Sequence, residues 1–220
     1  MHVTQETLET LFGEGHTLEV RKMLSQPGQF ASTDRVEVIG YNKKDPNGPR
    51  PSAMLSILGP VRKGDQVELS FTDARTLGIT APVRESGDTK GSGKCTLRGP
   101  KGEVDLEEGV IIAKRHIHMT PEDAKNFGVS NGDNVAVYVR TGNGRDTIFN
   151  DTVVRVSPSY ALAMHIDTDE CNAAAAFGTV YGELCLIDGG DCCCGEEEEG
   201  CCCGEGHGHH HEDGCCHHGH

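Results

Sequence analysis

Short segments of alternating apolar and polar residues, separated by turn dipeptides, recur along most of this chain. Residues 66–71, 134–139 and 152–156 alternate in this way, and residues 36–40 form a further strand candidate. A period of two places every second side chain on the same face, which is typical of a half-buried strand. Gly-Asp and Asn-Gly turns lie between the segments, at 64–65, 87–88, 131–133 and 143–144. Strands this short and this close favour barrels or a sandwich over a parallel sheet.

Three short helices are expected between the strands, which makes the fold class mainly β with short helices (α+β). Residues 5–12 and 121–127 each follow a threonine, Thr4 or Thr120, with a glutamate soon after, as at a capped helix start. Residues 161–177 contain an acidic cluster followed by an alanine run, which also predicts a capped helix.

The chain also resembles itself. Residues 2–7 match residues 118–123, and residues 72–79 parallel residues 122–129. Repeated strand–helix units indicate two related barrels, which we place at residues 1–104 and 105–188. In the second copy His118 has His116 two positions before it, whereas the equivalent partner of His2 would fall before Met1. We therefore expect either that the N-terminus is cut short or that its start codon is misassigned.

Composition changes sharply after Asp188. Residues 189–220 hold eight of the eleven cysteines, seven of the twelve histidines and eight acids, and no lysine or arginine. Adjacent cysteines lack the Cys-x-x-Cys spacing of a folded zinc knuckle, so we expect a disordered tail that chelates soft and borderline metal ions. A low-complexity extension with incidental affinity is the alternative. The candidate tail ligands are Cys192, Cys193, Cys194, Cys201, Cys202, Cys203, His209, His210, His211, Cys215 and Cys216.

Charge and targeting signals limit the partners. The net charge of −14 disfavours nucleic acid and anionic membranes, and the low aromatic content disfavours a stacking platform for bases. The sequence shows no secretory signal and no apolar run of about 18 residues. We therefore expect a cytoplasmic protein, in which Cys95, Cys171 and Cys185 are reduced thiols rather than a disulfide framework.

Histidines give the strongest chemical signal in the body of the chain. His116 and His118 are two residues apart, so on a strand both imidazoles face the same side and can reach one ion. His165 is the best candidate for a third ligand, and three histidines with an open fourth position describe a catalytic zinc site. Two surface histidines on a strand would give the same His-x-His pattern.

Two arginines and a glutamate lie near turns and strands of the first half. Arg62 and Arg84 each follow a turn, where the guanidinium fork suits a phosphate or carboxylate. A surface ion pair is the commoner role for a single arginine. Glu68 lies on the alternating strand and could ligate a metal, although a lone glutamate on a strand is usually solvated.

Four segments together resemble a known family. They are Gly-Pro-Val-Arg at 59–62 with Gln-Val-Glu-Leu-Ser at 66–70, Pro-Val-Arg-Glu-Ser-Gly-Asp at 82–88, Arg-His-Ile-His-Met-Thr-Pro at 115–121, and Met-His-Ile-Asp-Thr-Asp-Glu-Cys-Asn-Ala at 164–173. These segments resemble the phosphate propanoyltransferases, the phosphotransacylases of propanediol-utilisation type. The resemblance covers nearly all of residues 1–187, in order and at family-like spacing.

The resemblance implies reversible transfer of a short acyl group, propanoyl or acetyl, between coenzyme A and inorganic phosphate, with acyl phosphate as the product. It also implies two tandem β-barrels capped by short helices and a two-zinc site between them. By the resemblance, His116, His118 and His165 match the ligands of one zinc, His2 and Glu68 match two ligands of the other, and Arg62 matches the arginine that holds phosphate. A homo-oligomer, a bacterial microcompartment lumen and association with its shell are compatible with the resemblance but not visible in this sequence.

Two alternatives to the phosphotransacylase stay open at this stage. One is a non-catalytic metal-storage or metal-delivery protein on an enzyme-like body, which the tail and the lone His2 motivate. The other is a zinc-dependent thioester hydrolase, in which water replaces phosphate.

Overall fold

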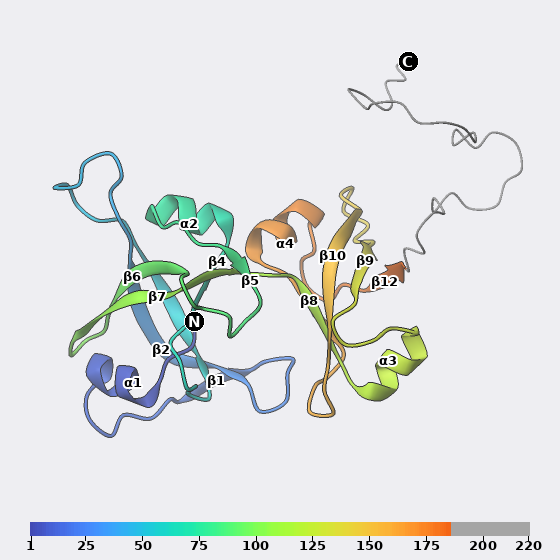
Figure 1. Ribbon diagram of the computed structural model, residues 1–220, viewed down its shortest axis with the longest axis horizontal. Coiled ribbons are helices and arrows are strands. Elements are labelled where there is room, and N and C mark those ends of the chain that lie inside the picture. Colours follow the sequence, from blue (N-terminus) through green and yellow to red (C-terminus); the bar gives the residue numbers. More distant parts are fainter. Residues whose placement is uncertain (186–220) are drawn as a thin grey trace, which may run out of the picture. The chain divides into compact units, whose positions relative to one another are not determined.

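The structure is a computed structural model that describes residues 1–185. Within this range the chain is mainly β with four short helices, which confirms the expected fold class (Figure 1). Residues Met1–Leu186 form one compact unit. The predicted chelating tail, residues 189–220, lies outside the described residues.

The first sheet has seven strands. Five follow the order β1-β2-β6-β7-β4, with β3 paired to β2 and β5 paired to β7. Both β4 and β5 run parallel to β7, and the other pairs are antiparallel. Their bounds are β1 (Val20–Met23), β2 (Phe30–Ile39), β3 (Ser52–Gly59), β4 (Val67–Leu69), β5 (Val83–Arg84), β6 (Gly93–Arg98) and β7 (Glu103–Ala113).

The second sheet has five strands in the order β11-β8-β10-β9-β12. Only β8 and β10 are parallel neighbours in it. Figure 1 shows β7 leading directly into β8, which carries the chain from the first sheet to the second. The bounds are β8 (His116–Met119), β9 (Asn134–Val139), β10 (Thr147–Val156), β11 (Ala163–His165) and β12 (Gly182–Cys185).

Both sheets therefore mix parallel and antiparallel neighbours. Among the described strands, no pairing returns from the last strand of either sheet to its first. Two complete barrels, and the division at residue 104, stay predictions.

Each helix begins at a polar residue whose side chain accepts a hydrogen bond from the first turn. The expected helices are confirmed as α1 (Gln5–Phe12), capped by Thr4, and α3 (Pro121–Phe127), capped by Thr120. The third expected helix is shorter than residues 161–177: α4 (Thr168–Ala174) begins only after Asp167, because residues 163–165 are β11. No helix in the described part is long and apolar enough to cross a membrane.

One helix was missed. The alternation over residues 66–71 predicts a strand, but β4 ends at Leu69 and α2 (Phe71–Leu77) starts at once. The Ser70 hydroxyl accepts from the backbone N–H of Asp73, which turns the chain into the helix. Helices α2 and α4 lie side by side (Figure 1), and the Asp169 carboxylate accepts from the backbone N–H of Thr72 at 2.8 Å.

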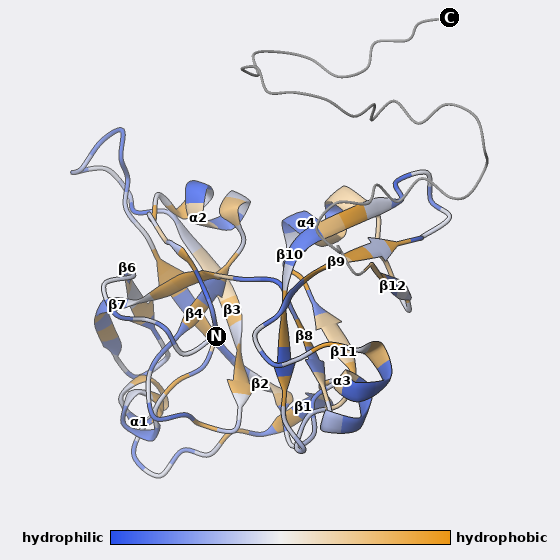
Figure 2. Ribbon diagram, turned by 45° about the vertical axis from the view of Figure 1, so that its right-hand side comes forward, coloured by the Kyte–Doolittle hydropathy of each residue, from blue (hydrophilic) through white to orange (hydrophobic). Residues whose placement is uncertain are grey.

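Two hydrophobic cores hold the described part together. Figure 2 shows apolar segments along the strands and polar residues predominating in the loops. The first core includes Val36, Leu97 and Ile112, and the second includes Met119 and Val154. Because each sheet buries one face in its core, the alternate side chains of its strands point to the opposite face.

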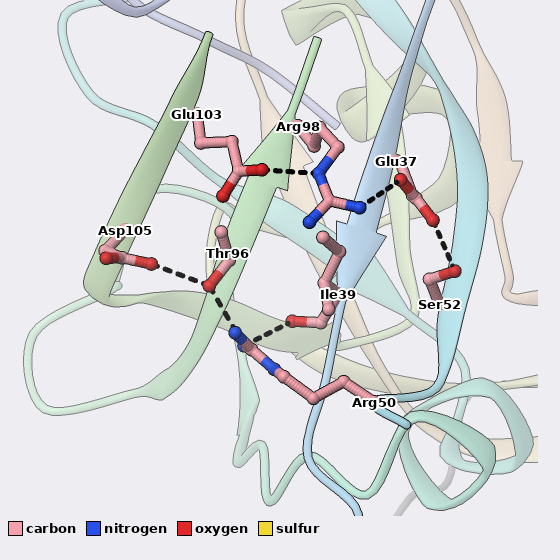
Figure 3. Close-up of polar contacts among 8 residues, drawn as sticks. All are labelled: Glu37, Ile39, Arg50, Ser52, Thr96, Arg98, Glu103 and Asp105. Carbon is pink, nitrogen blue, oxygen red and sulfur yellow. Dashed lines mark hydrogen bonds and ion pairs between the residues drawn. The ribbon is translucent and has the colours of Figure 1, made fainter. Parts of the chain in front are cut away.

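A polar network fastens four strands of the first sheet to one another (Figure 3). Arg98 on β6 donates to Glu103 on β7 and to Glu37 on β2. Arg50, just before β3, donates to the Thr96 hydroxyl of β6 at 2.9 Å. These contacts link β2, β6 and β7 to the start of β3.

Candidate metal and anion site

The second sheet separates its core residues from its histidines by strict alternation. On β8, Ile117 and Met119 enter the second core, so His116 and His118 point to the opposite face. On β11, Met164 packs against the same core and His165 follows it on the other face. Antiparallel pairing places His165 directly opposite His116.

This register brings the three imidazoles together. Their ring centroids lie 4.7 to 4.9 Å apart, and one nitrogen of each lies within 4.8 Å of the others. The group of His116, His118 and His165 can therefore hold a metal ion, as predicted from the spacing of the sequence.

The hydrogen bonds of the rings fit a metal ligand set. His116 Nδ1 lies 2.9 Å from the backbone carbonyl of Lys114, so Nδ1 carries the proton and Nε2 keeps its lone pair. Both ring nitrogens of His118 are buried without a hydrogen-bond partner among the described residues. A buried polar atom without a partner costs about 1–3 kcal/mol, and a bound ion would remove that penalty. The His118 ring also stacks on Tyr160, with centroids 4.0 Å apart.

All three imidazoles favour their neutral form, which is the form that binds metal. The pKa of His118 is lowered to about 3, mainly by burial and to a smaller extent by the charges of His116, His165 and Arg155. Burial likewise lowers the pKa of His165 to about 4. Burial is also the main reason that the pKa of His116 is lowered.

The first sheet contributes a second pair of candidate ligands by the same alternation. His2 pairs with Gln66 through two backbone hydrogen bonds, of 2.7 and 2.9 Å. Val67 and Leu69 enter the first core, so Glu68 points to the other face. The Gln66 amide donates to the Glu68 carboxylate at 2.6 Å and fixes its orientation. Burial, with the charge of Arg62, lowers the pKa of His2 to about 4.

One local pattern positions four of these five ligands. Each candidate ligand stands two residues before the capping residue of a helix, with an apolar core residue between them. The four triplets are His2-Val3-Thr4 before α1, Glu68-Leu69-Ser70 before α2, His118-Met119-Thr120 before α3 and His165-Ile166-Asp167 before α4. The sequence repeat matched two of these units, at His2 and His118, and it also paralleled residues 72–79, which follow the unit at Glu68, with residues 122–129. The unit at His165 became visible only from the capped start of α4.

A single cavity of about 560 Å³ collects all five candidate ligands. Arg62 also lines it, and Arg62 Nη1 donates to the Ser86 hydroxyl at 3.2 Å. Arg84 is not among the lining residues. Its side chain pairs with Asp88 at 2.8 Å and is largely exposed, so a phosphate-binding role for Arg84 stays a prediction.

Three cavity residues escaped the sequence analysis. Gln26 is only 2% exposed, donates to the Ala161 carbonyl at 2.9 Å, and has its amide nitrogen 3.3 Å from His165 Nε2. It lies on a loop and meets His165 across 139 residues of sequence, so no local signal marks it. Tyr160 is similar. Arg155 is the polar residue of an alternating segment, on the face opposite Val154 and Val156, and that position by itself marks no site.

The cysteines of the described part are free thiols away from the cavity lining. Cys95 is buried, and burial raises its pKa to about 12. Cys171 on α4 donates its thiol to the Ala176 carbonyl. The cysteines and histidines of the predicted tail site lie outside the described residues.

Comparison with known proteins assigns the chain to a family. The model of the phosphate propanoyltransferase family matches residues 1–177. Proteins named phosphate propanoyltransferase from Thermotoga maritima and Salmonella typhimurium are 49% and 48% identical to it, over 79% and 80% of both chains. One from Listeria monocytogenes is 45% identical over 84% of this chain and 82% of its own. This chain belongs to the phosphate propanoyltransferase family.

Proposed function

We propose that this protein is an acyltransferase that moves a short acyl group, propanoyl or acetyl, reversibly between coenzyme A and inorganic phosphate, with zinc in its cavity. Membership of the phosphate propanoyltransferase family supports the acyl transfer. One observation carries the choice of site: three imidazoles that favour their neutral form and a half-buried arginine line the same cavity, and one imidazole has no hydrogen-bond partner among the described residues.

In this proposal the three histidines of the second sheet hold one zinc ion, and His2 and Glu68 are ligands of a second. Bound zinc would supply Lewis acidity, which stabilises negative charge on a carbonyl or phosphoryl oxygen. Lys114 sets the His116 tautomer through its carbonyl, and Gln66 holds Glu68 in place. These supporting contacts keep the ligand atoms free for an ion.

Arg62 holds the phosphate. Its guanidinium is half-buried, and the Ser86 hydroxyl, which also accepts from the Gln66 amide at 2.8 Å, fixes one end of the fork. The remaining N–H groups can donate to phosphate oxygens. Because Gln66 contacts both Ser86 and Glu68, one buried side chain links the anion-binding and metal-binding parts of the cavity.

The reaction needs positioning more than a protein nucleophile. A phosphate oxygen attacks the thioester carbonyl carbon, the carbon–sulfur bond breaks, and the coenzyme A thiolate leaves and takes up a proton. Holding both anions in one cavity makes this attack effectively intramolecular. The proposal needs no acyl-enzyme intermediate. Neither cysteine is placed as a nucleophile, because Cys95 is buried in the first core and the Cys171 thiol is hydrogen-bonded to the Ala176 carbonyl. A Cys171→Ala variant should keep most of the activity.

The assay supplies acyl phosphate and coenzyme A to the zinc-loaded full chain and follows thioester absorbance. The proposal expects thioester formation, and in the reverse direction coenzyme A release that depends on phosphate. Coenzyme A release without phosphate would instead identify a thioester hydrolase. Absence of turnover in both directions would overturn the proposal and leave a metal-storage protein.

A further inference from the structure

Arg155 lies beside the histidines in the sheet. On β10 it is the register partner of His118 on β8, and the two strands are parallel. Val154 and Val156, its neighbours, pack in the second core, so the Arg155 side chain projects to the face that carries His118. Arg155 lines the same cavity as Arg62.

The charge of Arg155 lacks a protein partner in the described part of the chain. Other cations near the site are paired: Lys114 with Asp151 at 3.3 Å, and Arg115 with Glu170 at 2.9 Å. Among residues 1–185, Arg155 makes neither an ion pair nor a side-chain hydrogen bond, although it is half-buried. A half-buried cation without a partner is costly, and an anionic ligand would offset that cost.

The acids that line the cavity are already engaged. Glu68 accepts from the Gln66 amide. Asp73 is hydrogen-bonded to the cap residue Ser70 at the start of α2, and Asp167 itself caps α4. The protein therefore leaves two arginines, Arg62 and Arg155, facing the cavity without an ion pair among the described residues.

The two guanidinium groups are close enough to affect each other. Burial is the main reason that the pKa of Arg62 is lowered; the charge of Glu68 opposes the shift, and the positive charge of Arg155 adds to it. Two like charges sharing a cavity repel each other, and a dianion between them would convert that repulsion into attraction.

We propose that Arg155 is a second anion-binding arginine, which contacts the phosphoryl group of inorganic phosphate or acyl phosphate together with Arg62. The inference rests on the proposed function and adds a substrate contact to it. Its ligand chemistry is a phosphate group, which coenzyme A also carries, so the test must separate the two sources.

The experiment measures steady-state kinetics of Arg155→Gln and Arg155→Lys with acyl phosphate and coenzyme A varied separately. We expect Arg155→Gln to raise the KM for acyl phosphate about tenfold or more, the usual effect of losing a charge-assisted hydrogen bond. The KM for coenzyme A should stay within about threefold. Arg155→Lys should fall between, since lysine keeps the charge but loses the fork.

Arg145→Gln is the matched control, because Arg145 is exposed and lies outside the cavity lining, so both KM values should stay unchanged. Zinc content and melting temperature of each variant separate a substrate contact from a structural role. An unchanged KM for acyl phosphate would overturn the inference. A rise in the KM for coenzyme A alone would overturn it too, and would place Arg155 on the coenzyme's phosphates.

Calorimetric titration with inorganic phosphate keeps this test independent of turnover. If the wild-type protein catalyses no transfer, the proposed function fails, and phosphate binding still decides the inference. Phosphate binding that weakens in Arg155→Gln and not in Arg145→Gln would support it. Equal binding in both variants, or no binding to the wild-type protein, would contradict it.

Discussion

The two sheets place residues at the cavity through the same local pattern, but the resulting sets of candidate metal ligands differ. Each provides residues two positions before helix caps: His2 and Glu68 from the first sheet, His118 and His165 from the second. The second sheet adds His116, on the same face of the same strand as His118. That one extra histidine turns a pair of ligands into a compact triad of imidazoles.

The difference shows how a repeated unit can diverge in chemistry. The triad combines three neutral nitrogen ligands, which suit zinc. The first-sheet pair combines one imidazole with a carboxylate that Gln66 holds. We therefore expect the triad to bind its ion more tightly than the first-sheet pair binds its own. Loss of the first-sheet pair should lower turnover while the triad keeps its metal.

Replacing the central histidine of the triad should have the largest effect. We expect His118→Ala to lose the triad's zinc and to lower the activity more than about 100-fold. Even residues that only hydrogen-bond to a metal ligand typically contribute about 10–100-fold to metal affinity or activity. Elemental analysis and the thioester assay measure both. His16→Ala, outside the cavity lining, is the control. Full activity of His118→Ala after removal of zinc would refute the role of the metal.

Neutralising the first-sheet carboxylate should have a smaller effect. Glu68→Gln keeps an oxygen to accept from Gln66 but removes the charge, so the fold should persist. We expect activity to fall about 10–100-fold while the triad keeps its zinc. The same substitution at Glu6, exposed on α1, should change neither quantity. Loss of the triad's zinc in Glu68→Gln would show that the two ligand sets are not separable.

Gln26 tests how far the triad depends on the loop of the first sheet. Gln26→Met keeps a similar volume but loses the contacts to Ala161 and His165. We expect about tenfold weaker zinc affinity, the lower end for a residue that supports a ligand. Competition with a chelator measures it. Gln5→Met, a substitution at an exposed position of α1, should leave the zinc affinity at the wild-type value. An unchanged zinc affinity in Gln26→Met would show that Gln26 does not support the triad.

Acid should destabilise the metal-free protein through both ligand sets. Burial holds the pKa of His2 and His165 at about 4 and that of His118 at about 3, below the ordinary 6.5. Between about pH 6.5 and 4 the unfolded chain binds protons that the folded chain does not, so the free energy of unfolding should fall as pH falls. Urea unfolding across this range measures the slope.

Single variants assign that slope to the two sheets. His165→Gln and His2→Gln should each make it shallower, by about one proton at most. A slope that neither substitution changes would mean that these imidazoles are not the groups that resist protonation.

The sequence predicted those parts of the site that depend on local periodicity. Thr4 and Thr120 marked the starts of α1 and α3, and the two-residue spacing of His116 and His118 placed them on one face. Helix α2 was missed because the apolar alternation runs through Leu69 to Phe71, and only the Ser70 cap ends the strand.

Long-range contacts were beyond prediction. The position of His165 opposite His116 depends on the pairing of β8 with β11, and Gln26 reaches the triad from a loop. Neither contact leaves a periodic trace in a single sequence. The recurring order of candidate ligand, core residue and cap shows how local sequence placed four of these side chains on the cavity face. Their roles as metal ligands stay predictions.

We propose that the triad of the second sheet would hold zinc in the same cavity in which Arg62 would bind phosphate. Crystals of the full chain grown with zinc and phosphate, measured at the zinc absorption edge, test this directly. We expect an anomalous peak among His116, His118 and His165, with phosphate between it and Arg62. Zinc bound only elsewhere, with these three imidazoles free of metal, would contradict it.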